Sequence, residues 1–260
     1  MKEGKKIYFA SDLHLGAPSI TDPGEHEKRF VTWLDSIKND AEEIFLVGDI
    51  FDFWYEFRYS VPKGYTRFLG KLSELTDSGV RVHIFTGNHD VWYFDYLPKE
   101  CGVIVHDRPY ETGINGKVFF IDHGDELGDV PASYLMMKKL FRNRTAQWLF
   151  KLIHPDLAIS FARWWSKKSR HKNMLSNKAD YWGDDKEWQV RFANDYIKKN
   201  PQINYFVFGH RHIAKVIPLN EKSKVIYLGD WTAIFSYAVF DGKELKLEYY
   251  NREPEHMGDK

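Results

Sequence analysis

The amino-acid sequence predicts an α/β fold that carries a helical insertion, and three patterns support this expectation. In the first half of the chain, short apolar runs typical of strands alternate with segments whose apolar residues recur at helical spacing. Between residues 131 and 188 the strand pattern stops and aromatic-rich helical segments follow one another. Strand patterns return after residue 200. Strands alternating with helices favour a mostly parallel inner sheet, whereas the shorter linkers near the C-terminus favour an antiparallel second half.

The elements of the first half are strands separated by helices. Each expected strand is an apolar run that stops at a glycine or polar residue: Ile7–Ala10, Glu43–Val47, Val80–Phe85 and Lys117–Ile121. Each expected helix spaces its apolar side chains three or four residues apart: Glu25–Ile37 and Thr66–Thr76.

The remaining elements are helices up to residue 197 and strands after it. Proline cannot continue a helix begun upstream, so Pro155 separates the last two of three helices expected in the insertion: Tyr134–Phe141, Ala146–Ile153 and Leu157–Trp165. A helix at Trp188–Ile197 precedes the expected strands Tyr205–Phe208, Val225–Leu228, Ala233–Phe240 and Leu245–Tyr249. We therefore expect residues 1–130 and 189–251 to form one core, residues 131–188 a helical cap insertion, and residues 252–260 a flexible tail.

Charge is balanced over the whole chain but unevenly distributed. The formal net charge is 0, so bulk charge points to no partner. Between Lys138 and Lys178, however, eleven lysines and arginines stand against one acidic residue, Asp156. Such a block is either a solvated helix face or a surface for phosphate, an anionic headgroup or nucleic acid.

Cysteine content and hydropathy indicate a cellular compartment. The single cysteine, Cys101, excludes an intrachain disulfide and suits a reducing compartment; we expect it to be inert, in a loop before a strand. The apolar run before Ser11 is too short for a signal peptide, and no stretch of about 18 uncharged apolar residues is present. We expect a cytoplasmic protein, with peripheral contact with the inner membrane left open.

Five of the segments that follow expected strands carry side chains of the types that bind metal ions. They read Asp12-Leu13-His14, Gly48-Asp49, Gly87-Asn88-His89-Asp90, His123-Gly124-Asp125 and Gly209-His210-Arg211-His212. The carboxyl ends of strands in an α/β sheet converge on one crevice, so these side chains are expected to meet there. Residues two apart in an extended segment can point the same way, and the glycines allow tight turns and close backbone approach.

The types of ligand indicate two divalent ions rather than one. The set has two carboxylates, one amide oxygen and four imidazoles without a thiolate, which suits Mn²⁺, Fe or Zn²⁺ better than a structural zinc. Two ions about 3.5–4 Å apart, bridged by a carboxylate, would use the whole set: Asp12, His14, Asp49, Asn88, His123, His210 and His212. Apart from these four and His89, the remaining six of the eleven histidines lack this context and are expected to be core or loop residues: His26, His83, His106, His154, His171 and His256.

The order D-x-H, GD-x-x-D, GNHD, H, GH-x-H from Asp12 to His212 resembles that of the calcineurin-like metallophosphoesterases. The resemblance implies a four-layer α/β/β/α sandwich, with two sheets flanked by helices and a helical cap insertion. One metal would take Asp12, His14, Asp49 and His212. The other would take Asn88, His123 and His210, with Asp49 bridging the two.

The same resemblance implies a division of chemical roles. Water activated by the two cations would attack phosphorus in line. His89 would act at the leaving group as an acid or as a charge stabiliser, held in place by Asp52 of the GDIFD segment.

A closer resemblance, to the UDP-2,3-diacylglucosamine diphosphatases of lipid A synthesis, covers nearly the whole chain. It is carried by residues 12–15, 48–54 and 123–127 and by the basic helical insertion before the GH-x-H strand. Those enzymes cleave a pyrophosphate to release UMP and a lipid-linked sugar phosphate, lipid X. This chain departs from them at His89, where that group usually has arginine.

The helical cap of those enzymes holds the acyl chains, which implies roles for the insertion in this chain. Its apolar lining would be Trp148, Leu149, Phe150, Leu152, Phe161, Trp164 and Trp165. The residues near the phosphates would be Lys167, Lys168, Ser169, Arg170 and Lys172. The expected partner is thus a nucleotide-linked lipid, and ordinary helix packing is the alternative explanation for the aromatic residues.

Other functions compete with this interpretation. The same chemistry could act on a soluble nucleotide or, less in keeping with the motifs, on nucleic acid through the basic block. A protein phosphatase is disfavoured because Phe53-Trp54 stands where that group has Arg-Gly. A metal-binding scaffold without catalysis is disfavoured because every ligand position is filled. The residues indicate no oligomeric state.

Overall fold

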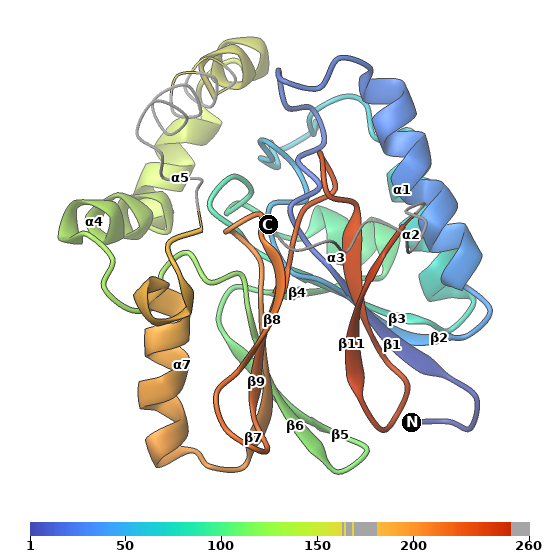
Figure 1. Ribbon diagram of the computed structural model, residues 1–260. Coiled ribbons are helices and arrows are strands. Elements are labelled where there is room, and N and C mark those ends of the chain that lie inside the picture. The colour runs from blue at the N-terminus through green and yellow to red at the C-terminus, as the bar shows by residue number, and fades with distance from the viewer. Residues whose placement is uncertain (163, 165–167, 169–180, 251–260) are drawn as a thin grey trace.

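In the computed structural model, the described residues (1–162, 164, 168 and 181–250) form two β-sheets packed face to face, with helices on both outer faces (Figure 1). This is the predicted four-layer α/β/β/α sandwich. The helices of residues 132–162 lie beyond one end of the sheets.

The first sheet has the strand order β11-β10-β1-β2-β3-β4. Strands β1 to β4 are parallel, as predicted, with β4 at the edge of the sheet, and β10 pairs antiparallel with both β1 and β11. The strands are β1 (Lys6–Ala10), β2 (Ala41–Leu46), β3 (Arg81–Phe85), β4 (Ile104–His106), β10 (Ser236–Phe240) and β11 (Leu245–Tyr249).

The second sheet has the order β5-β6-β7-β9-β8. Its strands are β5 (Tyr110–Ile114), β6 (Lys117–Asp122), β7 (Ile203–Phe208), β8 (Ala214–Pro218) and β9 (Lys224–Leu228). The prediction of an antiparallel second half is wrong for β7, which pairs parallel with β6 and β9. The reason is that β8 takes the sheet edge, where it pairs antiparallel with β9, so the chain returns and β9 runs in the direction of β7.

Helices α1 (Pro23–Ile37), α2 (Thr66–Asp77) and α3 (Tyr96–Cys101) cover the first sheet, and α7 (Trp188–Lys199) covers the second (Figure 1). The start of α1 follows from its sequence, because the side chain of Asp22 accepts a hydrogen bond from the N–H of Glu25 and Pro23 opens the first turn. The prediction of a loop at Cys101 is wrong. Cys101 ends α3, and burial raises the pKa of its thiol, which keeps it in the unreactive protonated form.

Both faces of strand β1 are packed against apolar side chains. Tyr8 and Ala10 face the helix layer, while Ile7 and Phe9 point between the sheets. The ring of Phe9 stacks on Phe45 at 5.0 Å and on Phe119 of the other sheet at 5.8 Å, centroid to centroid. Each such buried side chain contributes about 1.5–3 kcal/mol to the stability of the fold. The packed strand therefore holds the residues that follow it in a fixed position.

The segment expected to be an insertion begins with helices α4 (Ala132–Phe141) and α5 (Arg144–Lys151), and residues 155–162 are also α-helical. The 3₁₀ helix η1 (Asp184–Lys186) lies near its end. The segment is anchored to the sandwich by the hydroxyl of Tyr55, which donates to the carbonyl of Gln147 at 2.6 Å. The indole of Trp92 donates to the carbonyl of Phe141 at 2.9 Å. The end of the helix expected at Leu157–Trp165 and the tail at 252–260 lie outside the described residues. Among the described residues, none of the helices combines the length and apolarity needed to cross a bilayer.

Candidate metal centre

Strained backbone marks the ends of the central strands. In the described part of the chain, eight residues other than glycine have positive φ, and five of them are predicted metal ligands. They are Asp12 (φ 56°), His14 (49°), Asp49 (53°), His210 (68°) and His212 (51°). Each such conformation costs on the order of 1–3 kcal/mol and persists only where the surroundings enforce it. The concentration of strain at these residues indicates a functional site.

The side chains of one predicted ligand group converge. His14 Nε2 lies 3.2 Å from His212 Nε2, 3.7 Å from Asp12 Oδ1 and 3.8 Å from Asp49 Oδ2. His212 Nε2 lies 3.2 Å from Asp12 Oδ1. Donor atoms of Asp12, His14 and His212 lie within 4.8 Å of one another, and Asp49 Oδ2 adjoins this group at His14.

The other predicted group shares Asp49 with the first. His123 Nε2 lies 3.4 Å from Asp49 Oδ2 and 3.3 Å from Asn88 Oδ1. One atom each of Asp49, His123 and His210 also lie within 4.8 Å of one another. Asp49 thus stands between the two groups, where a bridging carboxylate would have to be.

The imidazoles are held with one nitrogen toward the cluster. His123 Nδ1 donates to the carbonyl of Val47 at 2.9 Å, His14 Nδ1 lies 3.9 Å from Asp52 Oδ1, and His212 Nδ1 lies 3.6 Å from Asp230 Oδ2. In all three cases Nε2 is left to face the cluster, which is the arrangement that orients metal-binding histidines. Asp230 was missed from the sequence, although Gly229-Asp230 follows β9 just as Gly48-Asp49 follows β2.

Two glycines make room for the ligands. A Cβ at Gly48, which has φ +81°, would lie 2.4 Å from His123 Nδ1, and a Cβ at Gly87 would lie 2.1 Å from Asp49 Oδ1. Any other residue at either position would displace a predicted ligand.

The buried carboxylates give the cluster a strong preference for positive charge. Burial alone would lower the pKa of His212, but Asp12 and Asp230 together outweigh it and raise that pKa to about 10. Burial would also lower the pKa of His123, yet Asp49 holds it well above its usual range. The pKa of Asp49 itself is well below its usual range, because the imidazoles of His123 and His89 overcome its burial.

Divalent cations fit this donor set. Asp12 Oδ1 is buried and accepts no hydrogen bond from any described residue, so its lone pairs are free for an ion. The neighbouring atoms are imidazole nitrogens and carboxylate oxygens, the ligands that Mn²⁺, Fe and Zn²⁺ accept.

His89 stands at the open side of the cluster. Its Nδ1 lies 3.5 Å from Asp52 Oδ1 and 3.2 Å from the carbonyl oxygen of Asp52, and its ring packs edge-on against His14 at 4.9 Å. Its side chain is 19% exposed, against 2% for that of His14. His89 also forms a third group of convergent atoms with His14 and Asp49.

Asp90 ties together two of the ligand loops and was not identified from the sequence. Its carboxylate accepts hydrogen bonds from the backbone N–H groups of Asp49 (3.2 Å), Ile50 (2.7 Å), Phe51 (3.1 Å) and Gly87 (2.8 Å), and from the hydroxyl of Tyr93. It is fully buried, and burial together with the nearby Asp49 raises its pKa to about 6.

We expect an Asp90→Ala variant to lose both stability and metal affinity. Each buried N–H left without an acceptor costs about 1–3 kcal/mol, so urea unfolding should show a loss of several kcal/mol. Loss of a group that orients metal ligands should weaken metal binding roughly 10–100-fold. Asp95→Ala on the exposed start of α3 is the matched control. Unfolding and metal binding equal to those of the wild type would contradict this role for Asp90.

The histidines that were expected to be core or loop residues have other partners or are exposed, as far as the structure describes them. His26 Nε2 lies 2.7 Å from the carbonyl oxygen of Leu13 and so supports the segment between two predicted ligands. His83 and His106 contact each other at 2.8 Å near the edge of the first sheet, and His154 is exposed. His171 and His256 lie outside the described residues.

The residues predicted to contact substrate lie in the insertion, and the structure describes only some of them. Trp164 is 55% exposed, and the ammonium of Lys168 lies 5.1 Å from the centroid of its indole ring. Phe150 packs on Tyr55 and Trp92 of the sandwich, at 4.8 and 5.2 Å between centroids. Outside the described residues lie Trp165, Lys167, Ser169, Arg170 and Lys172.

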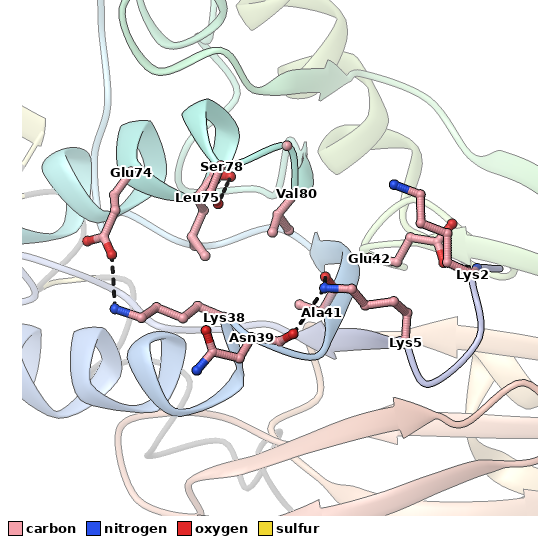
Figure 2. Close-up of a pocket in the computed structure, with 11 residues that line it drawn as sticks. Lys2, Lys5, Lys38, Asn39, Ala41, Glu42, Glu74, Leu75, Ser78 and Val80 are labelled. Atoms are coloured by element: carbon pink, nitrogen blue, oxygen red, sulfur yellow. Dashed lines mark hydrogen bonds and ion pairs between the residues drawn. The ribbon is translucent and has the colours of Figure 1, made fainter.

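A hollow lies at the end of the strands opposite the metal cluster. This cavity of about 390 Å³ is formed where β1, β2 and β3 begin, and Figure 2 shows Lys38 directed toward the carboxylate of Glu74 and Lys5 toward the carbonyl of Asn39. Lys38 Nζ lies 3.2 Å from Glu74 Oε1, and Lys5 Nζ donates to the carbonyl of Asn39 at 3.0 Å. Ligands of α/β sheets bind at the carboxyl ends of strands, so we place the chemistry at the metal cluster.

Known proteins resemble the chain over most of its length. Residues 5–214 match the model of the calcineurin-like phosphoesterase family. A Porphyromonas gingivalis protein named UDP-2,3-diacylglucosamine hydrolase is 44% identical, over 94% of this chain and 97% of its own length. A protein of the same name from Ectopseudomonas mendocina is 26% identical, over 86% and 90%. The solved phosphoesterase Yfce from E. coli is 14% identical, covers 95% of this chain and 93% of its own, and has a TM-score of 0.46. The chain therefore belongs to the calcineurin-like phosphoesterase family, whose members are metal-dependent hydrolases.

Proposed function

We propose that this hydrolase cleaves the pyrophosphate of UDP-2,3-diacylglucosamine, a step of lipid A synthesis, to give lipid X and UMP. The observation that carries the proposal is the proximity of two features in one molecule: a cluster suited to two cations and a helical insertion rich in exposed apolar side chains. A lipid-linked nucleotide needs both. The 44% identity to a relative named for this substrate, along nearly its whole length, supports the same conclusion.

Seven residues would hold two divalent ions, with Asp49 shared between them. One group is Asp12, His14 and His212, and the other is Asn88, His123 and His210. The mixed nitrogen and oxygen donors favour Mn²⁺, with Fe or Zn²⁺ as alternatives. When bound, the ions would polarise the phosphoryl oxygens and lower the pKa of water. The surrounding structure enforces strained backbone at five of these residues, which supports a site whose donors are held in place before the ions bind.

His89 would act on the departing phosphate. Its imidazole is 19% exposed at the rim, and Asp52 orients it through Nδ1, so Nε2 would be placed to donate a proton or stabilise the developing negative charge. The diphosphatases that the sequence resembles usually have arginine at this position, and a protonated imidazole would supply the same charge.

The exposed face of the insertion would hold acyl chains and meet the inner membrane. Its helices present many apolar side chains to solvent: Met136 (71% exposed), Leu140 (59%), Trp148 (59%), Leu149 (55%), Leu152 (66%), Leu157 (66%) and Phe161 (55%). Exposed lysines and arginines lie among them, for example Lys139, Arg144 and Lys151. Apolar groups mixed with basic ones are typical of helices at a lipid surface, where the bases meet anionic headgroups.

We expect a Trp148→Ala/Trp164→Ala variant to lose activity toward the lipid substrate alone. A large apolar side chain contributes about 1.5–3 kcal/mol when buried, so kcat/KM for UDP-2,3-diacylglucosamine should fall at least about tenfold. Hydrolysis of bis-p-nitrophenyl phosphate, a small soluble diester, should barely change. Val216→Ala removes an exposed apolar group from β8 and serves as the control.

Three other results would each count against a lipid cap. Equal losses on both substrates together with a lower Tm would mean that the two tryptophans only support the fold. Unchanged kinetics on the lipid would mean that acyl chains bind elsewhere. Salt-sensitive binding of nucleic acid without turnover of any lipid would assign the basic block to a different partner.

A further inference from the structure

Lys138 departs from the basic block in which it lies. The other lysines and arginines described in α4 and α5 are at least partly exposed, but Lys138 is 1% exposed. A buried ammonium is stable only when its three donors find acceptors, because its desolvation would otherwise cost several kcal/mol. Its surroundings therefore show what α4 is built to contact.

Three oxygens from two loops of the sandwich surround the Lys138 ammonium. Nζ lies 2.8 Å from Asp125 Oδ2 and 3.2 Å from Glu126 Oε1, and it donates to the carbonyl of Gly87 at 3.1 Å. Asp125 is two residues after His123, and Gly87 directly precedes Asn88. One side chain of the insertion thus bridges the loops that carry two predicted ligands of the same metal.

The contact continues along one face of α4. One turn before Lys138, the hydroxyl of Tyr134 donates to Asp125 Oδ2 at 2.5 Å, and one turn after it Arg142 pairs with Glu126 at 2.7 Å. Spacing of four residues places these three side chains on the same face of the helix. The Asp125 carboxylate therefore contacts both Tyr134 and Lys138, two side chains on the same face of α4.

The geometry of the ligands depends on this junction. Asn88 Oδ1 and His123 Nε2 stand 3.3 Å apart, although their loops follow β3 and β6, which belong to different sheets. No strand pairing joins β3 to β6 among the described strands, so side chains must set the separation of the two loops. The Lys138 ammonium does so, because it holds the peptide group before Asn88 and the carboxylate after His123 at the same time.

We propose that Lys138 is a positioning residue through which helix α4 holds Asn88 and His123 at the separation required by one of the two metals. This inference rests on the metal assignment proposed above. If so, the affinity of the protein for that ion depends on how α4 packs against the loops of the sandwich. By linkage, a ligand that steadies α4 must tighten the ion, and the ion must tighten the ligand.

The test is Mn²⁺ binding to the metal-free protein, followed by calorimetry and by elemental analysis after dialysis. The wild type should bind two ions. Lys138→Met should bind one ion with wild-type affinity and the other roughly 10–100-fold more weakly, as expected when a group that orients ligands is lost. Lys198→Met, which removes an exposed lysine near the end of α7, should match the wild type. Saturating Mn²⁺ should restore most of the kcat of Lys138→Met.

A second variant guards against misfolding, since Lys138→Met leaves Asp125 buried without its partner. Lys138→Met/Asp125→Asn removes both charges and should fold, while the Gly87 carbonyl still lacks its donor, so the second ion should remain weak. Two ions bound with wild-type affinity in either folded variant would overturn the proposal, as would an equal weakening of both ions. A wild type that binds fewer than two ions would instead refute the metal assignment.

Discussion

An Asp49→Ala variant is expected to lose turnover and bound metal together. Asp49 Oδ2 lies 3.8 Å from His14 Nε2 and 3.4 Å from His123 Nε2, so one carboxylate serves both ligand groups. Without it, two neighbouring cations would repel each other unscreened. Metal ions supply several kcal/mol of transition-state stabilisation, so kcat should fall by at least about 10³-fold.

The measurement pairs elemental analysis of bound metal with kcat on a soluble phosphodiester. Asp77→Ala, at the exposed end of α2, is the control for a general effect of charge. Full activity with two ions retained in Asp49→Ala would rule out a shared carboxylate.

A His89→Ala variant is expected to lose turnover while keeping its metal. A positioned acid or charge stabiliser contributes roughly 10²–10⁴-fold to kcat. His89 is more exposed than His14, and its Nδ1 is directed at Asp52, so the ring is placed to reach a substrate oxygen at the rim. His89→Arg should restore part of the loss, because a guanidinium can stabilise charge although it cannot donate a proton.

Metal content distinguishes the two roles open to His89. Its imidazole also converges with His14 and Asp49, the geometry that a ligand would have. If elemental analysis finds fewer ions in His89→Ala than in the wild type, His89 is a ligand and its proposed action on the leaving group is wrong.

The strand ends of this fold could be predicted because apolar runs and ligand side chains are both local features of the sequence. Residues 7–10 and 43–47 read as buried strands, and the structure places strands there, with Asp12 and Asp49 directly beyond them. Strands β5 and β8 were missed, and β4 was expected only as a strand without stated bounds after Cys101. They are short edge strands with exposed positions, so their apolar pattern is weak.

Two supporting residues of the site, Asp90 and Lys138, could not be predicted, because their roles depend on contacts between distant segments. Asp90 acts by accepting N–H groups of residues 49–51, about forty positions earlier in the chain. Lys138 reads as one more member of a basic block until α4 is seen to lie over the loops at Gly87 and Asp125. Asp230 could have been found, because Gly229-Asp230 after β9 repeats the glycine and aspartate that follow β2.

Product analysis by mass spectrometry tests the central claim most directly. Mn²⁺-loaded wild type is incubated with UDP-2,3-diacylglucosamine in detergent micelles, with bis-p-nitrophenyl phosphate in a parallel reaction to show that the metal centre is active. The account predicts UMP and 2,3-diacylglucosamine 1-phosphate in equal amounts, with formation stopped by a chelator. UDP as the nucleotide product, or an intact lipid substrate beside rapid hydrolysis of the soluble diester, would contradict it.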